Sequence, residues 1–234
     1  SNYIGLWNER PQGSTEYVVQ LRKALDAGGF PDVGITVEAS WQPLINNVLT
    51  NAAFNASVAA ASKHYPCNST CSAALAAGKK FWAGEDVPTG YANWTAASCW
   101  GRKLNQHYVK ISATSTVSWA LLWAAYPGES LTFAGYGFVT ANEPWSAHYD
   151  VSPTVWVMAH WGQFVQPGWR FLAVANATAR VVGGAGFLAE GGSYVTLVPP
   201  SRALRPTGDA YPPSTFVMVI ETLQGACGAQ GGCN

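Results

Sequence analysis

Short apolar segments alternate with helix-like segments along the first half of the chain. Apolar and β-branched residues predict strands at 3–9, 33–40, 56–66 and 80–86. Apolar residues at helical spacing predict helices at 14–29, near 43–51, at 72–80 and at 98–109. A strand that continues into a loop is expected at 111–125. Alternation of this kind is typical of βα units and predicts an α/β fold with a parallel sheet.

The helix expected at 14–29 carries clear start and stop signals. Ser14 or Thr15 can cap its first turn, because a hydroxyl there accepts a hydrogen bond from an unpaired backbone N–H. Gly28 is expected to end it, since glycine readily adopts the conformation that follows a last helical turn.

The pattern changes after about residue 150. The segment 152–172 predicts an aromatic-rich helix and a turn, whereas 191–200 and 214–223 predict antiparallel strands between Pro- and Gly-rich loops. We therefore expect one domain over 1–172 and a second, the start of a β-sandwich, over 173–234.

Composition narrows the class of protein. The chain has 234 residues, of which 48% are hydrophobic, enough for a sizeable core. Thirteen basic and thirteen acidic residues cancel, so no global field favours nucleic acid or anionic lipid as a partner. No apolar run reaches the roughly 18 residues of a transmembrane helix, and the N-terminus does not resemble a signal peptide. The 11 Trp and 10 Tyr residues fit either core packing or platforms for sugar rings.

Glycosylation sequons and cysteines indicate the secretory pathway, which leads to the lysosome or the cell exterior. The sequons begin at Asn55, Asn68, Asn93 and Asn176. The five cysteines are Cys67, Cys71, Cys99, Cys227 and Cys233. Their spacings fit no zinc template, so disulfides are favoured over a metal site, with one thiol left over or paired outside this segment.

Polar side chains follow the predicted strands, and two of them are carboxylates suited to catalysis. Glu9 ends the first strand and Glu85 ends the fourth. Cleavage of a glycosidic bond needs an acid for the leaving oxygen and a second carboxylate across the sugar, with no metal or cofactor. The structural alternatives are a salt bridge of Glu9 to Arg10 or to a neighbouring loop, and a helix N-terminal position for Glu85.

Several longer motifs resemble a known enzyme family. They are "YIGLWNER" at 3–10, "HYP" at 64–66, "KKFWAGED" at 79–86, "CWGRKLNQHYV" at 99–109, "STVSWALL" at 115–122, "EPWSAHY" at 143–149, "QFVQPGW" at 163–169 and "GGSYV" at 191–195. In this order they resemble glycoside hydrolase family 59, the galactocerebrosidase family. The resemblance implies a (β/α)8 TIM-type barrel, incomplete here with about strands four to eight, followed by the first strands of a β-sandwich.

The resemblance also implies roles for individual residues. Asn8 would bind the sugar 2-hydroxyl, Glu9 would be the acid/base and Glu85 the nucleophile of a double displacement. Trp119 would stack on galactose, or else be a core residue at the barrel rim. His64 would orient a carboxylate, or be a structural histidine.

The implied reaction removes terminal β-galactose from galactosylceramide-like glycosphingolipids, presented by a saposin-type carrier. The alternatives are a retaining β-glycosidase acting on another galactoside or glycolipid, and a non-catalytic glycan-binding relative. For the cysteines, the resemblance implies that Cys99 pairs with Cys227 or Cys233, which leaves Cys67 and Cys71 for a local bridge.

The chain departs from the family in three respects. The three βα units that precede "WNER" in the family are not in this sequence, so we expect a fragment that is inactive or poorly folded in isolation. Phe133 takes the place of a family tyrosine near the pocket. Gly84 and Pro88 replace hydroxyl residues around the proposed nucleophile.

Overall fold

The computed structural model describes residues 2–6, 8–9, 13–40, 42–87, 93–126, 128, 137–173, 184–201, 204–212 and 214–223. The chain divides into two compact units. The first combines Ser1–Asp86 with Ile111–Val117, and the second combines Val87–Lys110 with Ser118–Asn234. The domain boundary expected between 172 and 173 stays a prediction.

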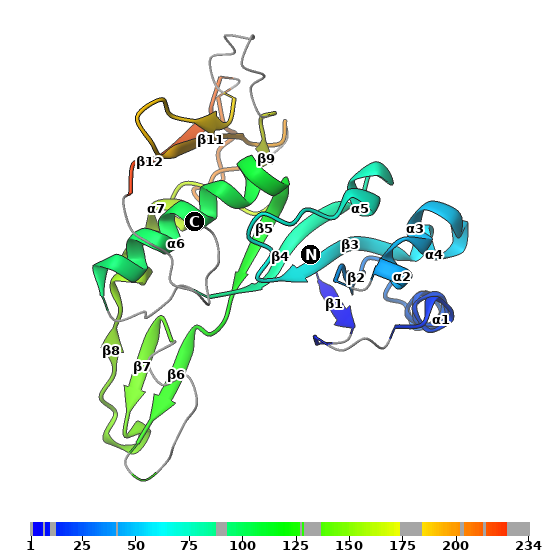
Figure 1. The fold of residues 1–234 in the computed structure, drawn as a ribbon, viewed down its shortest axis with the longest axis horizontal. Helices are drawn as coiled ribbons and strands as arrows, with labels where there is room; N and C mark the ends of the chain where they lie inside the picture. The colour runs from blue at the N-terminus through cyan, green and yellow to red at the C-terminus, as the bar shows by residue number, and fades with distance from the viewer. Residues whose placement is uncertain are drawn as a thin grey trace. The chain divides into compact units, whose positions relative to one another are not determined.

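The first unit is built on a sheet of five strands in the order β1-β2-β3-β4-β5 (Figure 1). The strands are β1 (Tyr3–Leu6), β2 (Gly34–Glu38), β3 (Val58–His64), β4 (Lys80–Asp86) and β5 (Ala113–Ser118). The strands from β1 to β4 pair in parallel. The helices of this unit are α1 (Thr15–Ala27), α2 (Gln42–Ile45), α3 (Asn47–Thr50), α4 (Ala52–Ser57) and α5 (Ser72–Ala76). The predicted α/β fold with a parallel sheet is confirmed.

Local capping explains where these helices begin and end. Ser14 Oγ accepts a hydrogen bond from the Tyr17 amide at 3.2 Å, and Gly28 follows the last turn of α1, both as predicted. The strand expected from residue 56 begins at Val58 instead, because α4 occupies the residues before it. Asn51 starts that helix by accepting a hydrogen bond from the Phe54 amide at 2.9 Å.

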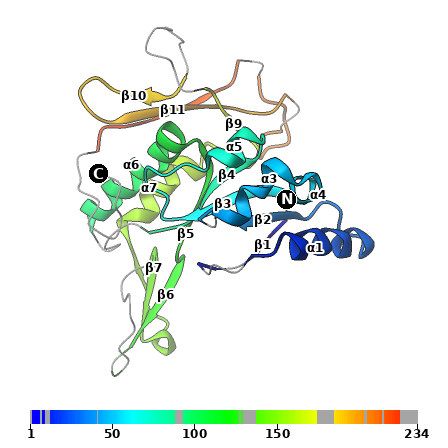
Figure 2. The same cartoon turned by 45° about the vertical axis from the view of Figure 1, so that its right-hand side comes forward.

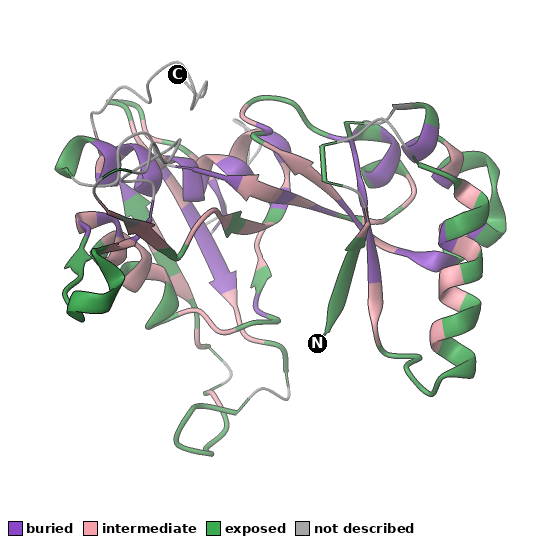
Figure 3. Ribbon diagram, turned by 90° about the horizontal axis from the view of Figure 1, so that it is seen from below, coloured by how far each residue is buried: buried purple, intermediate pink, exposed green. Residues whose placement is uncertain are grey.

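The two faces of the sheet carry different side chains. Ile35 and Val37 of β2 and Phe81 of β4 belong to the buried cluster that packs against the helices. Figure 3 shows that buried stretches occur in both strands and helices. Because strand side chains alternate, Glu38 and Ser62 point to the opposite face. The helix-facing side is therefore the core, and polar groups gather on the other side.

The register between β3 and β4 shifts near their carboxyl ends. Lys63 lies opposite Ala83, but the next residue, His64, lies opposite Glu85, so Gly84 has no partner of its own. With regular alternation Glu85 would point to the face that carries Phe81, toward the helices. The shift turns Glu85 to the face of His64.

Glycine at position 84 suits this irregular stretch. A Cβ added there would overlap Ser62 Oγ and lie 3.0 Å from Ser62 Cβ. The side chain of Ser62 on β3 thus occupies the space that Gly84 on β4 leaves open.

The second unit contains the helices α6 (Trp94–Ile111) and α7 (Pro153–Gly162), the 3₁₀ turn η1 (Pro144–Ser146) and two small sheets (Figure 2). In one, β6 (Leu122–Ala125) pairs in parallel with β7 (Val139–Asn142), and β7 pairs with β8 (Asp150–Val151). In the other, β11 (Ser193–Val198) pairs antiparallel with β9 (Arg170–Phe171), β10 (Gly186–Phe187) and β12 (Val217–Glu221). The antiparallel pair predicted at 191–200 and 214–223 is confirmed, whereas β6 begins a separate sheet that the sequence did not reveal.

A buried amide ties the long helix of this unit to its antiparallel sheet. Asn105 of α6 donates to the backbone carbonyls of Ser193 in β11 and Val219 in β12, at 3.1 Å each. Both bonds use one side-chain nitrogen, so a single residue holds the helix to two strands.

The local bridge expected between Cys67 and Cys71 is wrong. Cys71 is a free, buried cysteine whose side chain packs in the first unit's core, while Cys67 is disulfide-bonded. Burial raises the pKa of the Cys71 thiol, which keeps it protonated and unreactive. Cys99 is also disulfide-bonded, but its expected partners, Cys227 and Cys233, lie outside the described residues.

Replacement of Gly84 by alanine should lower the free energy of unfolding by about 1–3 kcal/mol, the usual cost of forcing an extra methyl group into a packed site. Adding Ser62→Gly removes both obstructing atoms and should recover most of that loss. Denaturant titration of the single and double variants measures this. Gly162→Ala, where an added Cβ meets nothing within 4 Å, is the matched control. Equal destabilisation of the single and double variants would contradict the complementarity.

Candidate active site

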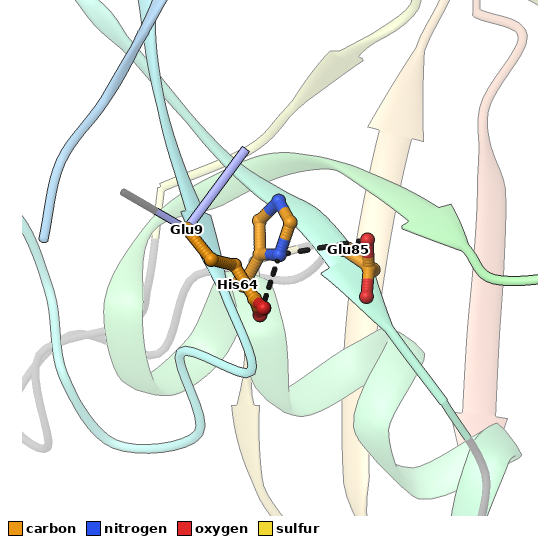
Figure 4. A group of neighbouring side chains, drawn as sticks. All are labelled: Glu9, His64 and Glu85. Atoms are coloured by element: carbon orange, nitrogen blue, oxygen red, sulfur yellow. Dashed lines mark hydrogen bonds and ion pairs between the residues drawn. The ribbon is translucent and has the colours of Figure 1, made fainter. Parts of the chain in front are cut away.

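Two carboxylates and one imidazole meet at the carboxyl ends of neighbouring strands. Glu9 follows β1, His64 is the last residue of β3, and Glu85 lies near the end of β4. His64 Nδ1 is 2.9 Å from Glu9 Oε1 and 3.5 Å from Glu85 Oε2 (Figure 4). One polar atom from each of the three side chains lies within 4.8 Å of the others. Residues far apart in the sequence thus form one compact cluster.

The backbone takes an uncommon conformation at two positions of this cluster. Glu9 has φ 49° and Tyr65 has φ 45°, both in the left-handed region that disfavours residues with a side chain. Such conformations persist where the surrounding structure enforces them, and they gather at functional sites.

Glu9 has the most exposed side chain of the cluster, at 51% of its side-chain area, against 14% for His64 and 19% for Glu85.

Tyr65 holds the Glu85 carboxylate from the side away from His64. Its hydroxyl donates to Glu85 Oε1 at 2.5 Å, and its backbone amide donates to the Glu85 carbonyl at 2.8 Å. Burial, and next the hydrogen bond to Glu85, raise the pKa of Tyr65 well above its ordinary value. The phenol therefore stays protonated and remains a donor at neutral pH. The sequence motif "HYP" contained this residue, but its role was not predicted.

A third carboxylate, Glu38 at the end of β2, reaches the same histidine. Only 4% of its side chain is exposed, and its Oε2 lies 3.9 Å from His64 Nε2. Asn8, Glu38, Ser62 and His64 line a small hollow of about 260 Å³ on this face of the sheet. Asn8, the other residue expected at the strand-one edge, thus belongs to the same site.

Trp119, the remaining expected site residue, follows β5 directly and belongs to the second unit. It is half-buried, and its ring meets Trp123 edge-on with centroids 4.8 Å apart. It also packs against the buried cluster around Trp100 and Phe138. These contacts fit the core alternative, and the expected stacking role stays a prediction.

The structural alternative for Glu85 does not apply, because Glu85 lies within β4 and the next helix of the described chain, α6, begins at Trp94. The alternative for Glu9 involves Arg10, which lies outside the described residues.

Glu9, His64 and Glu85 could each offer one ligand atom to a metal ion. His64 Nδ1 already hydrogen-bonds with Glu9 Oε1 and lies 3.5 Å from Glu85 Oε2, and Tyr65 donates to the other oxygen of Glu85.

Stability should fall more steeply above pH 10 in the unsubstituted protein than in Tyr65→Phe. A phenol with a raised pKa in the folded state contributes stability below the pKa of the unfolded chain, near 10, and loses it as pH rises toward the folded value. Denaturant titrations at several alkaline pH values measure the two slopes. Identical slopes would show that Tyr65 ionises as readily in the folded protein as in the unfolded chain.

Comparison with solved structures places the fold. The catalytic domain of GH30 xylanase C from Talaromyces cellulolyticus aligns with a TM-score of 0.56 at 17% identity, over 84% of this chain and 49% of that one. SrfJ from Salmonella typhimurium aligns with a TM-score of 0.58 at 13% identity, over 87% of this chain and 51% of that one. At these identities the likeness concerns the fold alone.

Sequence comparison identifies the family. Galactocerebrosidase of Mus musculus is 40% identical over 197 residues, and that of Homo sapiens is 39% identical over the same length. Each alignment covers 84% of this chain, which spans only 27% of the length of either relative. The model of "Glycosyl hydrolase family 59" matches residues 1–163. The chain therefore belongs to glycosyl hydrolase family 59.

Proposed function

We propose that this chain carries the catalytic pair of a retaining β-galactosidase that acts on galactosylceramide-like glycosphingolipids. The observation that carries the proposal is the approach of Glu9 and Glu85, whose carboxylate oxygens come within 4.8 Å. Carboxyl groups about 5–5.5 Å apart are typical of retaining glycosidases, whereas inverting enzymes keep them about 6.5–9.5 Å apart to admit a water molecule.

The first half of the reaction assigns one task to each carboxylate. Glu85 attacks the anomeric carbon, and Glu9 donates its proton to the departing glycosidic oxygen. The Tyr65 hydroxyl, which donates to Glu85 Oε1, leaves Oε2 as the oxygen without that bond and therefore as the attacking atom.

In the second half, Glu9 acts as a base and removes a proton from the incoming water. The water oxygen bonds to the anomeric carbon as the bond to Glu85 breaks, which restores both carboxylates. Asn8, beside Glu9, binds the sugar 2-hydroxyl, and Trp119 stacks on the apolar face of galactose.

The sheet of the first unit corresponds, in this proposal, to strands four to eight of a (β/α)8 barrel. Its helices cover one face, which carries the core, and polar side chains gather near the carboxyl ends of the strands on the other face, where the catalytic rim of a barrel lies. The antiparallel strands β10 to β12 correspond, in this proposal, to the first strands of a β-sandwich within 173–234, and β9, which pairs with β11, lies just before that range.

The proposed substrate is a lipid-linked sugar, and a saposin-type carrier is the proposed partner that presents it. Among the described residues, no helix is both long and apolar enough to span a bilayer. Disulfide-bonded Cys67 and Cys99 and the exposed sequon residues Asn68 and Asn93 support a route through the secretory pathway, to the lysosome or the cell exterior.

A 2-fluoro-galactosyl trap on the full-length protein tests the proposed roles. The trap should leave a label on the peptide that contains Glu85, detected by mass, because the slow second step accumulates the glycosyl-enzyme. Glu85→Gln should abolish labelling, whereas Glu143→Gln, at another left-handed but exposed glutamate, should not. Label from a glucose-configured trap instead would indicate another β-glycosidase. Glycan binding without any label would favour a non-catalytic relative.

Replacement of the proposed acid should affect substrates unequally. Glu9→Gln should lower the rate on a galactoside with a poor leaving group by about 10²–10⁴-fold, the usual contribution of general acid catalysis. A dinitrophenyl galactoside, whose leaving group needs no proton, should lose far less in the first step. Steady-state and burst kinetics on both substrates measure this. Equal rate losses on both galactosides in the first step would show that Glu9 is not the acid.

A further inference from the structure

Glu38 approaches His64 from the side opposite to Glu9 and Glu85. Its side chain is 4% exposed and its Oε2 lies 3.9 Å from His64 Nε2, while its Oε1 accepts the Ser40 amide at 3.0 Å. His64 Nδ1 meets both Glu9 and Glu85. The imidazole thus separates one buried carboxylate from two catalytic candidates, with a different ring nitrogen toward each side.

A buried carboxylate is costly unless a donor or a cation compensates it. The backbone amide of Ser40 satisfies one oxygen of Glu38, and the His64 ring is the group that faces the other. At 3.9 Å the Glu38 carboxylate acts on Nε2 through its charge and not through a hydrogen bond, and that charge favours the state in which Nε2 of His64 carries a hydrogen. In a neutral histidine only one ring nitrogen carries a hydrogen, so the state of Nε2 decides whether Nδ1 donates or accepts.

With a hydrogen on Nε2, the neutral ring has a lone pair on Nδ1, which lies 2.9 Å from Glu9 Oε1. A protonated Glu9 can then donate to Nδ1 and hold its proton until the glycosidic oxygen takes it. The opposite tautomer would place a hydrogen on Nδ1, directed at Glu9 and Glu85. Glu9 Oε1 would then have to accept that hydrogen, so the ring could no longer hold an acidic proton of Glu9 on this oxygen.

We propose that Glu38 is a positioning residue that fixes the His64 tautomer and thereby keeps Glu9 ready to act as the acid. This inference rests on the proposed function. The proton balance is simple: Glu9 gives its proton to the leaving oxygen and regains one from water, while His64 and Glu38 end each cycle unchanged. Glu38 acts through His64 and does not contact the reacting atoms.

Leaving-group dependence in the full-length protein tests this role. Glu38→Leu should lower kcat for an alkyl galactoside by at least about tenfold, the scale of outer partners that orient a histidine. The same variant should change the burst rate on a dinitrophenyl galactoside less than about threefold. Glu38→Gln keeps an acceptor oxygen for Nε2 and should recover part of the loss, and Glu190→Leu, at an exposed turn, should leave both rates unchanged.

The ring itself provides a second measurement that needs no turnover. ¹⁵N NMR of His64, assigned by comparison with His64→Asn, should show the hydrogen on Nε2 in the unsubstituted protein and a shift toward Nδ1 in Glu38→Leu. Equal losses on both galactosides, or a hydrogen on Nδ1 in the unsubstituted protein, would overturn the inference alone. No turnover and no trapped label in the unsubstituted protein would overturn the proposed function and this role with it.

Discussion

The candidate site depends on one register shift between β3 and β4. Parallel strands bring their carboxyl ends to one edge, but which face each side chain takes is set by a period of two. In regular pairing Glu85 would share the face of Phe81 and point into the core beneath the helices. The shift at His64 places Glu85 opposite the imidazole instead, at the cost of an irregular position that glycine occupies. The meeting of His64 and Glu85 follows from that single step, and Glu9 joins them from the end of β1.

Because the carboxylates lie close together, the groups that contact each of them determine how they differ in function. Tyr65 donates to one oxygen of Glu85, and its ionisation is suppressed by burial and by that carboxylate. His64 has two ring nitrogens and faces three carboxylates. The state of Nε2, which faces Glu38, therefore constrains whether Nδ1 can donate a hydrogen bond to Glu9 or Glu85 or accept one. The three acids are all glutamates with the same intrinsic chemistry. Their different contacts therefore determine how their protonation and reactivity differ. Exposure adds to it, because Glu9 is open to solvent while Glu38 is enclosed.

The sequence predicts well where the strands end, but it predicts poorly which face of the sheet each side chain occupies. Alternating segments, the Ser14 cap and the Gly28 stop required only local chemistry, so they could be predicted. The shift that turns Glu85 depends on the fit of Gly84 against Ser62 in another strand, which no local pattern reveals. The expectation for Cys71 was wrong for the same reason: the resemblance left it as the partner of Cys67, whereas tertiary packing places its thiol in the core. Glu38 ends β2, but the histidine it faces lies on the neighbouring strand, so no local pattern indicates this pairing.

Gly84 also shows why a departure from the family pattern need not change the pocket. The resemblance implies a hydroxyl residue at position 84, and glycine there first suggests a lost polar group. Ser62 Oγ, however, occupies the space that a Cβ at position 84 would enter, and both residues line the same hollow. The hydroxyl is supplied from β3 instead of β4, and the glycine that makes room for it also accommodates the register shift. Adjacent strands contribute side chains to the same face, so a polar group missing at one position can be present on the neighbouring strand. The hollow is therefore better compared between family members by the space that its atoms fill than residue by residue.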